Sequence, residues 1–321
     1  FAPQPGPCCG RAAECRNHRV QAAMTEALPA AASAWESWAW CAPKTIGGAW
    51  SFNCVKDERA IIWCVCAGLL VSFLATVVLL VFGNIAAPYG RYNQASEKAG
   101  QGFVMRQLSK VDVPVKVAWV VQECPTLIAA AACWAAGAPE CLGSAGNRLA
   151  LFCFTAHYFN RTIIYPMLLK GSKPIPLSVM LMAFMFCAMN GYIQCRTLTR
   201  YVVIELDAQC IAGSLVWIAG LCINIDSDHR LRNLRKPGET GYKIPSGGMF
   251  EYVSGANFLG EIIEWIGYAV VMKGAMAGAT FAFCTACNIG PRALAHHAWY
   301  KTKFENYPKH RAALVPFWPF G

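Results

Sequence analysis

Charged side chains are scarce in this sequence. Asp, Glu, Lys and Arg make up 14% of its 321 residues, whereas about a quarter of the residues of a soluble domain are charged. Acidic side chains are the scarcer kind, with 18 against 28 basic ones, so the formal net charge is +10. Nucleic-acid-binding proteins gather such charge on one solvated face, but here the basic residues lie in short loops between apolar runs. The composition predicts a membrane protein without a nucleic-acid partner.

Motifs that bind nucleotide phosphates or metals are missing as well. No GxGxxG follows a strand pattern and there is no P-loop, which excludes a Rossmann-type nucleotide site. Many of the 17 cysteines lie within apolar runs, where they behave as small hydrophobic residues. Cys284 and Cys287 form a CxxC pair, but no second ligand pair accompanies it, so we assign no metal.

Long apolar runs dominate the chain from residue 61 onward. The clearest is 61–83, which holds no charged residue and is long enough to cross a hydrocarbon layer about 30 Å thick. Further runs follow at 117–136, 149–169, 177–193, 210–225, 256–272 and 275–289. We therefore predict an all-α integral membrane protein, with about seven transmembrane helices in one domain over residues 56–321.

Residues 1–55 differ from the rest of the chain in composition. They are rich in Pro, Cys, Ala and Trp and show neither helical nor strand periodicity. No signal peptide is recognisable there. We expect this segment to be disordered or an artefact of the gene model. Residues 1–23 are interpreted as a translated upstream region or the edge of a fragment, with Met24 as the start.

Polar residues within the apolar runs mark candidate functional positions, because ionisable groups at bilayer depth are costly. Gln122 and Glu123 lie in the second run, where they form either a binding site or a clamp between helices. Tyr158, Arg161 and Tyr165 follow the spacing i, i+3, i+7 in the third run and share one helical face. That face points into a cavity or lies at the membrane interface, where long basic side chains reach the head groups.

A polar stripe and a basic loop add two further candidates. Asn257, Glu261, Glu264 and Tyr268 are spaced i, i+4, i+7, i+11, so two carboxylates and an amide share one face of the sixth run. This face binds a ligand or forms a polar seam between helices. Residues 227–248 hold five Lys or Arg among several Gly and Pro. Such a loop suits dinucleotide phosphates and suits anionic lipid head groups equally well.

These segments resemble the steroid 5α-reductase family. The family's C-terminal signature is similar to NIDSDHRLRNLRKPGETGYKIPSGGMFEYVSGANFLGEIIEWIGYA and to RALAHHAWYKTKFENYPKHRAALVPF, and its second and third spans are similar to AWVVQECP and HYFNRTIIYP. The resemblance starts near Asp57. It implies a seven-helix bundle of the endoplasmic reticulum membrane that encloses NADPH and admits a steroid from the lipid. No protein partner is predicted.

The resemblance also implies roles for individual residues. Glu123 and Tyr158 match the pair that binds the steroid C3 carbonyl, and Gln122 lies beside them. The positions that match NADPH-binding residues are Asn224, Asp228, Arg235, Tyr242, Asn257, Glu261, Arg292, His296 and Tyr300. Asp226 departs from the pattern, since a His is expected there.

The implied reaction is the NADPH-dependent reduction of the C4–C5 double bond of a 4-ene-3-oxosteroid such as testosterone or progesterone. Hydride adds at C5, C4 is protonated, and charge develops on the C3 oxygen, where Tyr158 would donate a hydrogen bond. Glu123 would donate as the neutral acid or orient Tyr158. Two alternatives stay open, a membrane reductase of enoyl-thioester or polyprenol lipids and an S-adenosylmethionine-dependent membrane methyltransferase. The match around Glu123 favours steroid, and the basic loop favours NADPH.

The distribution of Lys and Arg predicts the orientation in the membrane, because short cytoplasmic loops carry the excess of positive charge. With seven spans, the loops on the side opposite the basic loops and tail hold only Arg148, Arg196, Arg200 and Lys273, and the N-terminal segment, with six more Lys or Arg, is the exception. We therefore predict a lumenal N-terminus and a cytosolic C-terminus. On sealed microsomes, protease should remove a C-terminal tag and spare an N-terminal one. A protected C-terminal tag would contradict the seven-span topology.

Overall fold

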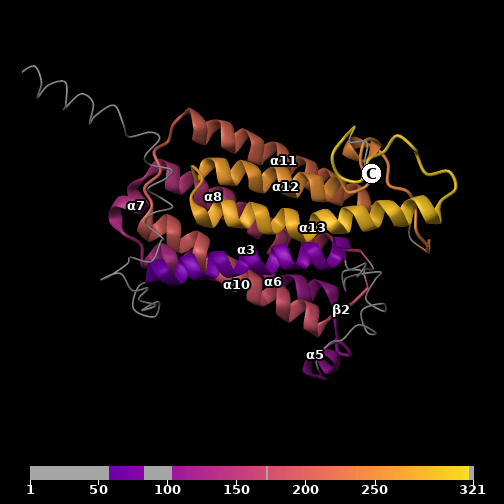
Figure 1. Cartoon of the computed structure of the whole chain (residues 1–321), viewed down its shortest axis with the longest axis horizontal. Coiled ribbons are helices and arrows are strands. Elements are labelled where there is room, and N and C mark those ends of the chain that lie inside the picture. The colour runs from indigo at the N-terminus through magenta and orange to yellow at the C-terminus, as the bar shows by residue number, and fades with distance from the viewer. Residues whose placement is uncertain (1–57, 83–102, 171–172, 237, 240, 318–321) are drawn as a thin grey trace, which may run out of the picture.

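The computed structural model describes residues 58–82, 103–170, 173–236, 238–239 and 241–317. Over these residues the protein is helical, and its strands are limited to the antiparallel pair of β1 (Asp112–Val113) and β2 (Ile175–Pro176). The long helices lie side by side along the longest dimension of the molecule (Figure 1). The interpretation of residues 1–55 concerns a segment outside the described residues.

Each predicted apolar run lies largely within one long helical segment of the described chain. These segments are α3 (Glu58–Phe82), α6 (Val115–Ala135), α8 (Ala145–Phe159) continued by the π-helical turn η2 (Asn160–Ile164) and α9 (Tyr165–Leu168), α10 (Leu177–Arg196) continued by the π-helical turn η3 (Thr197–Tyr201), α11 (Ala208–Arg232), α12 (Ala256–Val271) and α13 (Met276–Lys303). The shorter elements are α5 (Phe103–Leu108), α7 (Pro139–Gly143) and the 3₁₀ turn η4 (Gly248–Glu251).

Four helical segments of the described chain are long and apolar enough to cross a membrane: α3, α6, α10 with η3, and α11. They indicate a membrane protein. Helix α12 has only 16 residues, and α13 carries basic residues over its second half. The seven-span scheme also requires α8, α12 and α13 to cross the membrane and the bundle to enclose a cavity. These two features stay predictions.

Several helices extend beyond the apolar runs because their polar ends are paired with other helices. At the end of α10, Arg196 donates two hydrogen bonds to Glu58, at 2.6 and 2.9 Å, where α3 begins. Near the end of α11, Asp228 accepts a hydrogen bond of 3.1 Å from Arg161. The basic residues that were expected in loops or in the tail but lie within α11 and α13 are Arg230, Arg232, Arg292, Lys301 and Lys303.

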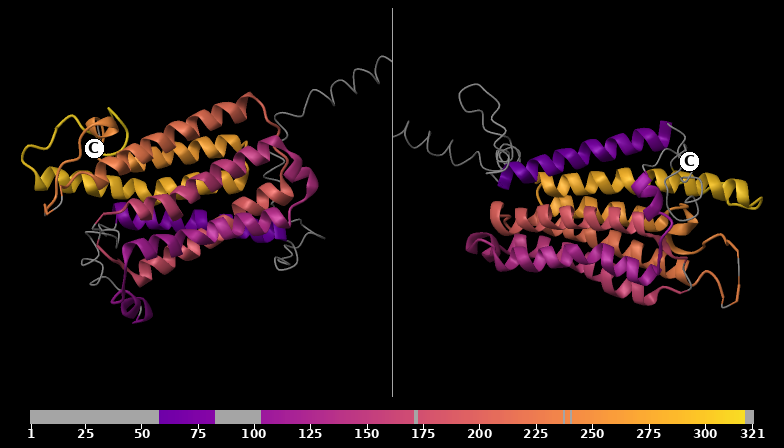
Figure 2. Two further views of the ribbon diagram at one scale, coloured as in Figure 1. Left: turned by 180° about the vertical axis from the view of Figure 1, so that it is seen from behind. Right: turned by 90° about the horizontal axis from the view of Figure 1, so that it is seen from below.

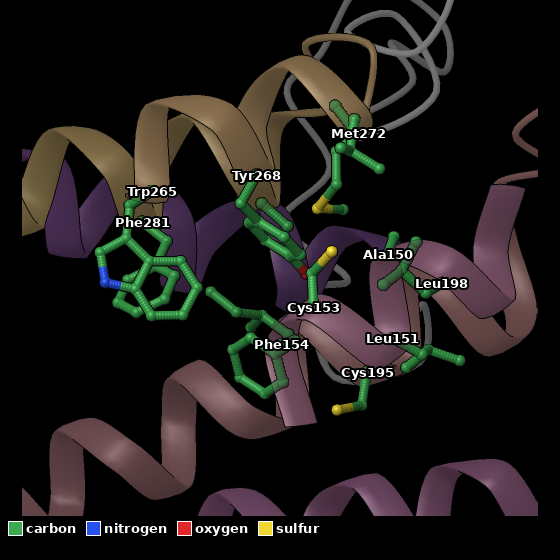
Figure 3. Packing of buried hydrophobic residues seen from close by; sticks show 14 of the residues in the cluster. Ala150, Leu151, Cys153, Phe154, Cys195, Leu198, Trp265, Tyr268, Met272 and Phe281 are labelled. Carbon is green, nitrogen blue, oxygen red and sulfur yellow. The ribbon is translucent and has the colours of Figure 1, made fainter. Parts of the chain in front are cut away.

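The helices pack as three main pairs, α11 with α12, α6 with α10, and α3 with α13. The loop after α11, α5, β2 and the C-terminal segment lie at one end of the bundle, and α7 lies at the other (Figures 1 and 2). Large aromatic side chains fill the centre, where the rings of Trp265 and Phe281 lie 4.1 Å apart (Figure 3). Phe154 from α8 joins them and contacts Tyr158, at 4.8 Å between ring centroids. Tyr158 is therefore held against a rigid core.

Helices α11 and α12 approach so closely that their main chains touch. A Cβ at Gly220 would lie 2.2 Å from the main-chain nitrogen of Glu264, and a Cβ at Gly260 would lie 2.5 Å from that of Asn224. Both distances are shorter than 3.0 Å, and real Cβ atoms essentially never come that close to another heavy atom. Small residues allow such contacts between helices in membranes, where packing drives association. The contact fixes the separation of the polar faces of α11 and α12.

We predict that Gly220→Ala destabilises the protein markedly, whereas Gly68→Ala does not. The new methyl group at Gly220 meets main-chain atoms that cannot rotate away, so the cost should reach or exceed the roughly 1–3 kcal/mol of overpacking. A Cβ at Gly68, on α3, meets nothing within 4 Å. Thermal unfolding in detergent, followed by fluorescence, measures both variants. Equal melting temperatures for the two would contradict the main-chain contact.

Candidate active site

Glu123 on α6 and Tyr158 on α8 lie beside the same face of α10. Glu123 accepts hydrogen bonds from Gln122 Nε2, at 3.1 Å, and from the thiol of Cys187, at 3.3 Å. The hydroxyl of Tyr158 accepts one from Asn190 Nδ2, at 3.3 Å, and Tyr158 is only 3% exposed. Cys187 and Asn190 lie one turn apart on α10, so Glu123 and Tyr158 meet the same face of that helix. The structure thus brings together the three residues predicted to contact the steroid.

A second cluster of polar side chains lies between α11 and α12. Asn224 donates a hydrogen bond of 3.0 Å to the main-chain oxygen of Asn257. Asp228 lies one turn beyond Asn224 on α11 and accepts a hydrogen bond of 3.1 Å from Arg161. Glu261 lies one turn beyond Asn257 on the same face of α12. Four of the residues predicted to bind NADPH are therefore neighbours.

Arg161 organises this cluster. It lies in the π-helical turn η2, its side chain is 13% exposed, and its guanidinium is 4.6 Å from the ring centroid of Trp119 and 4.7 Å from that of Tyr165. A cation in contact with two aromatic rings gains attraction from both. The side chain pairs with Asp228 on α11, and the alternative in which Arg161 lies at the membrane interface stays a prediction.

Helix α13 carries three further predicted residues on one face. Arg292, His296 and Tyr300 recur every four residues, which places them one above the other. Arg292 Nη2 donates to Asn288 Oδ1 at 3.0 Å, and the ring of His296 lies 5.6 Å from that of Phe258 on α12. His296 therefore lies close to Phe258, which directly follows Asn257 on α12.

The basic loop reaches the end of α13. Tyr242 packs edge-on against Trp299, with ring centroids 4.8 Å apart. Arg235 is exposed just beyond α11, and its side chain forms no hydrogen bond or ion pair with the described residues. The structure thus places Tyr242 against Trp299, the residue that precedes Tyr300 on α13, and leaves Arg235 at the surface of the same end of the bundle.

Asp226, which departs from the family pattern, anchors the far side of this loop. It forms an ion pair with Arg230 at 2.7 Å, and Arg230 occupies the space that a side chain at Gly247 would need. The Gly247 N–H donates to Glu251, which holds the pKa of that carboxyl below its usual value. Arg311 pairs with Glu251 at 3.3 Å. The loop and the C-terminal segment are therefore tied together.

Two buried polar pairs were missed by the sequence reasoning. His157 Nδ1 lies 2.8 Å from Glu264 Oε1, and both side chains are almost fully buried. Glu264 had been placed on the polar stripe, but nothing in its spacing pointed to His157. Asn190 and Gln194 are fully buried on α10 and joined by a hydrogen bond of 3.1 Å. The sequence feature that could have indicated this pair is the presence of two amide side chains one helical turn apart, one within an apolar run and one just after it.

Comparison with known proteins assigns the family. A sequence model of the family described as 3-oxo-5-alpha-steroid 4-dehydrogenase matches residues 173–318. 3-Oxo-5-alpha-steroid 4-dehydrogenase 1 of Homo sapiens is 49% identical over 248 residues, which cover 76% of this chain and 95% of the relative. This chain belongs to that family. The resemblance seen in the sequence is thereby confirmed, and the family consists of oxidoreductases that act on CH–CH bonds.

Other members of the 3-oxo-5-alpha-steroid 4-dehydrogenase family show a similar degree of likeness. The type 1 protein of Bos taurus is 44% identical over 250 residues, covering 76% of this chain and 92% of the relative. The type 2 protein of Rattus norvegicus is 42% identical over 250 residues, covering 76% of this chain and 93% of the relative. Both types are thus matched over nearly their whole length.

The polar cluster of this family member has the donors and acceptors that a dinucleotide needs. Asn224 Oδ1 and Ser227 Oγ are buried and have no hydrogen-bond partner among the described residues. An unpaired buried acceptor is costly, so it marks a place where a ligand can donate. Together with the amide of Asn257 and the carboxyl of Glu261, these atoms fit the carboxamide and hydroxyl groups of NADPH.

We predict that Arg161→Ala lowers the unfolding free energy by about 3–5 kcal/mol, because Asp228 is left buried without its partner charge. Adding Asp228→Asn should restore part of the loss, since a neutral amide needs no counter-charge. Lys243→Ala, which removes an exposed ion pair with Glu239, is the matched control and should change little. Chemical unfolding in detergent measures all three. A loss for Arg161→Ala no larger than for Lys243→Ala would show that the buried pair is not needed.

Proposed function

We propose that this protein uses NADPH to reduce the C4–C5 double bond of 4-ene-3-oxosteroids. The proposal is supported by family membership and above all by one observation, the position of both polar clusters along one helical segment. Tyr158 on α8 meets α10 through Asn190, and Arg161, three residues further along in η2, pairs with Asp228 on α11 at 3.1 Å. A substrate oxygen held by Tyr158 would therefore lie next to the cluster that fits the cofactor.

The residues around Tyr158 suit the charge that this reaction creates. Bound NADPH would supply the hydride that adds to C5. The hydroxyl of Tyr158 would donate to the C3 oxygen as negative charge develops there, and such a donor contributes about 2.7–4 kcal/mol to transition-state stabilisation. Glu123, held by Gln122 and Cys187, would donate as the neutral acid or orient Tyr158. The aromatic core behind Tyr158 keeps water away, which strengthens these interactions.

The cofactor would be held by residues from three helices and one loop. Asn257 and Glu261 would bind the nicotinamide carboxamide, and Asn224 and Asp228 would complete that end of the site. Exposed basic groups suit phosphates, because guanidinium groups match their oxygens in pairs. The residues assigned to the rest of the dinucleotide are Arg235, Tyr242, Arg292, His296 and Tyr300.

We further infer that the protein resides in the endoplasmic reticulum membrane as seven spans with a cytosolic C-terminus. The basic loop and the C-terminal segment lie at one end of the bundle, as this orientation requires (Figure 1). The four apolar helices support a membrane location, and a steroid would enter from the lipid. Neither a nucleic acid nor a protein partner is part of the proposal.

NADPH oxidation by the purified protein in lipid nanodiscs, with progesterone or testosterone as substrate, tests this function. We expect steroid-dependent oxidation and a 5α-reduced product identified by mass spectrometry. Tyr158→Phe should lower kcat about 10²- to 10³-fold with a smaller effect on the KM for steroid, because one donor is lost and the ring is kept. Tyr192→Phe is the control, since Tyr192 donates to Glu58. Absence of steroid-dependent oxidation, or a normal kcat for Tyr158→Phe, would contradict the proposal.

A further inference from the structure

A chain of buried hydrogen bonds follows one face of α10 and ends at Tyr158. Asn190 and Gln194 lie one turn apart on this face, with exposures of 1% and 0%. Gln194 Nε2 donates to Asn190 Oδ1 at 3.1 Å, and Asn190 Nδ2 donates to the Tyr158 hydroxyl at 3.3 Å. At its other end the chain reaches α12 and α13 through Tyr268 and the main-chain oxygen of Ala277.

The direction of this chain is set by a group that cannot be reversed. The main-chain carbonyl of Ala277 only accepts, so the side-chain group of Gln194 that lies 2.7 Å from it must be the NH₂. Both hydrogens of Gln194 Nε2 are then used, one by Ala277 and one by Asn190 Oδ1. The hydroxyl of Tyr268 donates to the remaining oxygen, Gln194 Oε1, at 3.4 Å. Asn190 is therefore left with its NH₂ toward Tyr158.

This orientation determines what Tyr158 can do. A phenol has one hydrogen to donate and an oxygen that accepts. Because Asn190 donates to that oxygen, the hydrogen of Tyr158 must point elsewhere. Accepting one hydrogen bond also makes the hydroxyl a stronger donor in the next, since hydrogen bonds in a chain polarise one another. The residue is thus prepared to donate before any substrate binds.

We propose that Asn190 is a positioning residue that keeps Tyr158 a hydrogen-bond donor toward the C3 oxygen of the steroid, and that Gln194 sets the orientation of Asn190. The inference rests on the role proposed for Tyr158 and adds two residues that act through it. Their function would be lost if the amide of Asn190 were replaced by a group that accepts from Tyr158, because the phenolic hydrogen would then turn away from the substrate.

Asn190→Asp makes this replacement with almost no change in size. The carboxylate can still accept from Gln194, but it accepts from Tyr158 as well. We expect kcat to fall about 10²-fold, approaching the loss of an oxyanion donor, while NADPH binding measured by fluorescence and the steroid KM change little. Asn190→Ala, which lets the hydroxyl rotate without drawing its hydrogen away, should lower kcat roughly fivefold to tenfold, the effect of one net hydrogen bond.

Measuring the Asn190 variants in protein that also carries Tyr158→Phe distinguishes a positioning role of Asn190 from a purely structural one. Without the phenolic hydroxyl there is no hydrogen to orient, so Asn190→Asp and Asn190→Ala should lower kcat no further in that background. Ser178→Ala is the control on the same helix, because it removes a partly buried hydrogen bond of 2.8 Å to Ser109 that does not belong to this hydrogen-bond chain. It should leave kcat unchanged.

The outcomes distinguish this inference from the function on which it rests. A normal kcat for Tyr158→Phe would overturn the role of Tyr158 itself. A reduced kcat for Tyr158→Phe together with a normal kcat for Asn190→Asp would overturn only the positioning role. Should Asn190→Asp fail to fold, Asn190→Ala decides the question. A normal kcat for Asn190→Ala would overturn the positioning role, and so would a loss of kcat that adds fully to the loss caused by Tyr158→Phe.

Discussion

Gly220 and Gly260 let α11 and α12 approach until their main chains touch, and the cofactor cluster depends on that approach. The touching main-chain atoms belong to Asn224, whose side chain is part of the site, and to Glu264, whose side chain pairs with His157. A wider separation would break the hydrogen bond from Asn224 to the main chain of Asn257. The polar faces of the two helices are thus set by main-chain packing, and side-chain pairing then refines their positions. This explains how a helical bundle without a Rossmann fold can offer an ordered set of donors and acceptors.

Polar residues inside the bundle are paired across helices. Arg161 joins α8 to α11 through Asp228, His157 joins α8 to α12 through Glu264, and Gln194 joins α10 to α12 and α13. Each pairing offsets the cost of taking a polar group out of water and fixes the geometry of its neighbours. Two of the buried atoms without partners among the described residues, Asn224 Oδ1 and Ser227 Oγ, lie where the cofactor is proposed to bind.

Much of this arrangement could be predicted from the sequence. Apolar runs located each long helix, and polar residues at helical spacing within them pointed to Glu123, Tyr158, Asn257 and Glu261. The apolar runs end several residues before α10, α11 and α13 do. Charged residues such as Arg196 and Asp228 lower the hydropathy of these helix ends, and hydropathy carries no information on the residues that pair with them. The pairing of His157 with Glu264 required knowledge of which helices face each other, and no sequence spacing contains that information.

The path of the hydride tests the account most directly. The protein would be given NADPH deuterated at C4 of the nicotinamide ring together with progesterone, and the steroid product would be analysed by mass spectrometry and NMR. The account predicts one deuterium at C5 of the steroid and none at C4 of the steroid, because the donors around Tyr158 stabilise charge on the steroid C3 oxygen while C5 receives the hydride. Deuterium at C3, the mark of carbonyl reduction, or no deuterium in the product would contradict it.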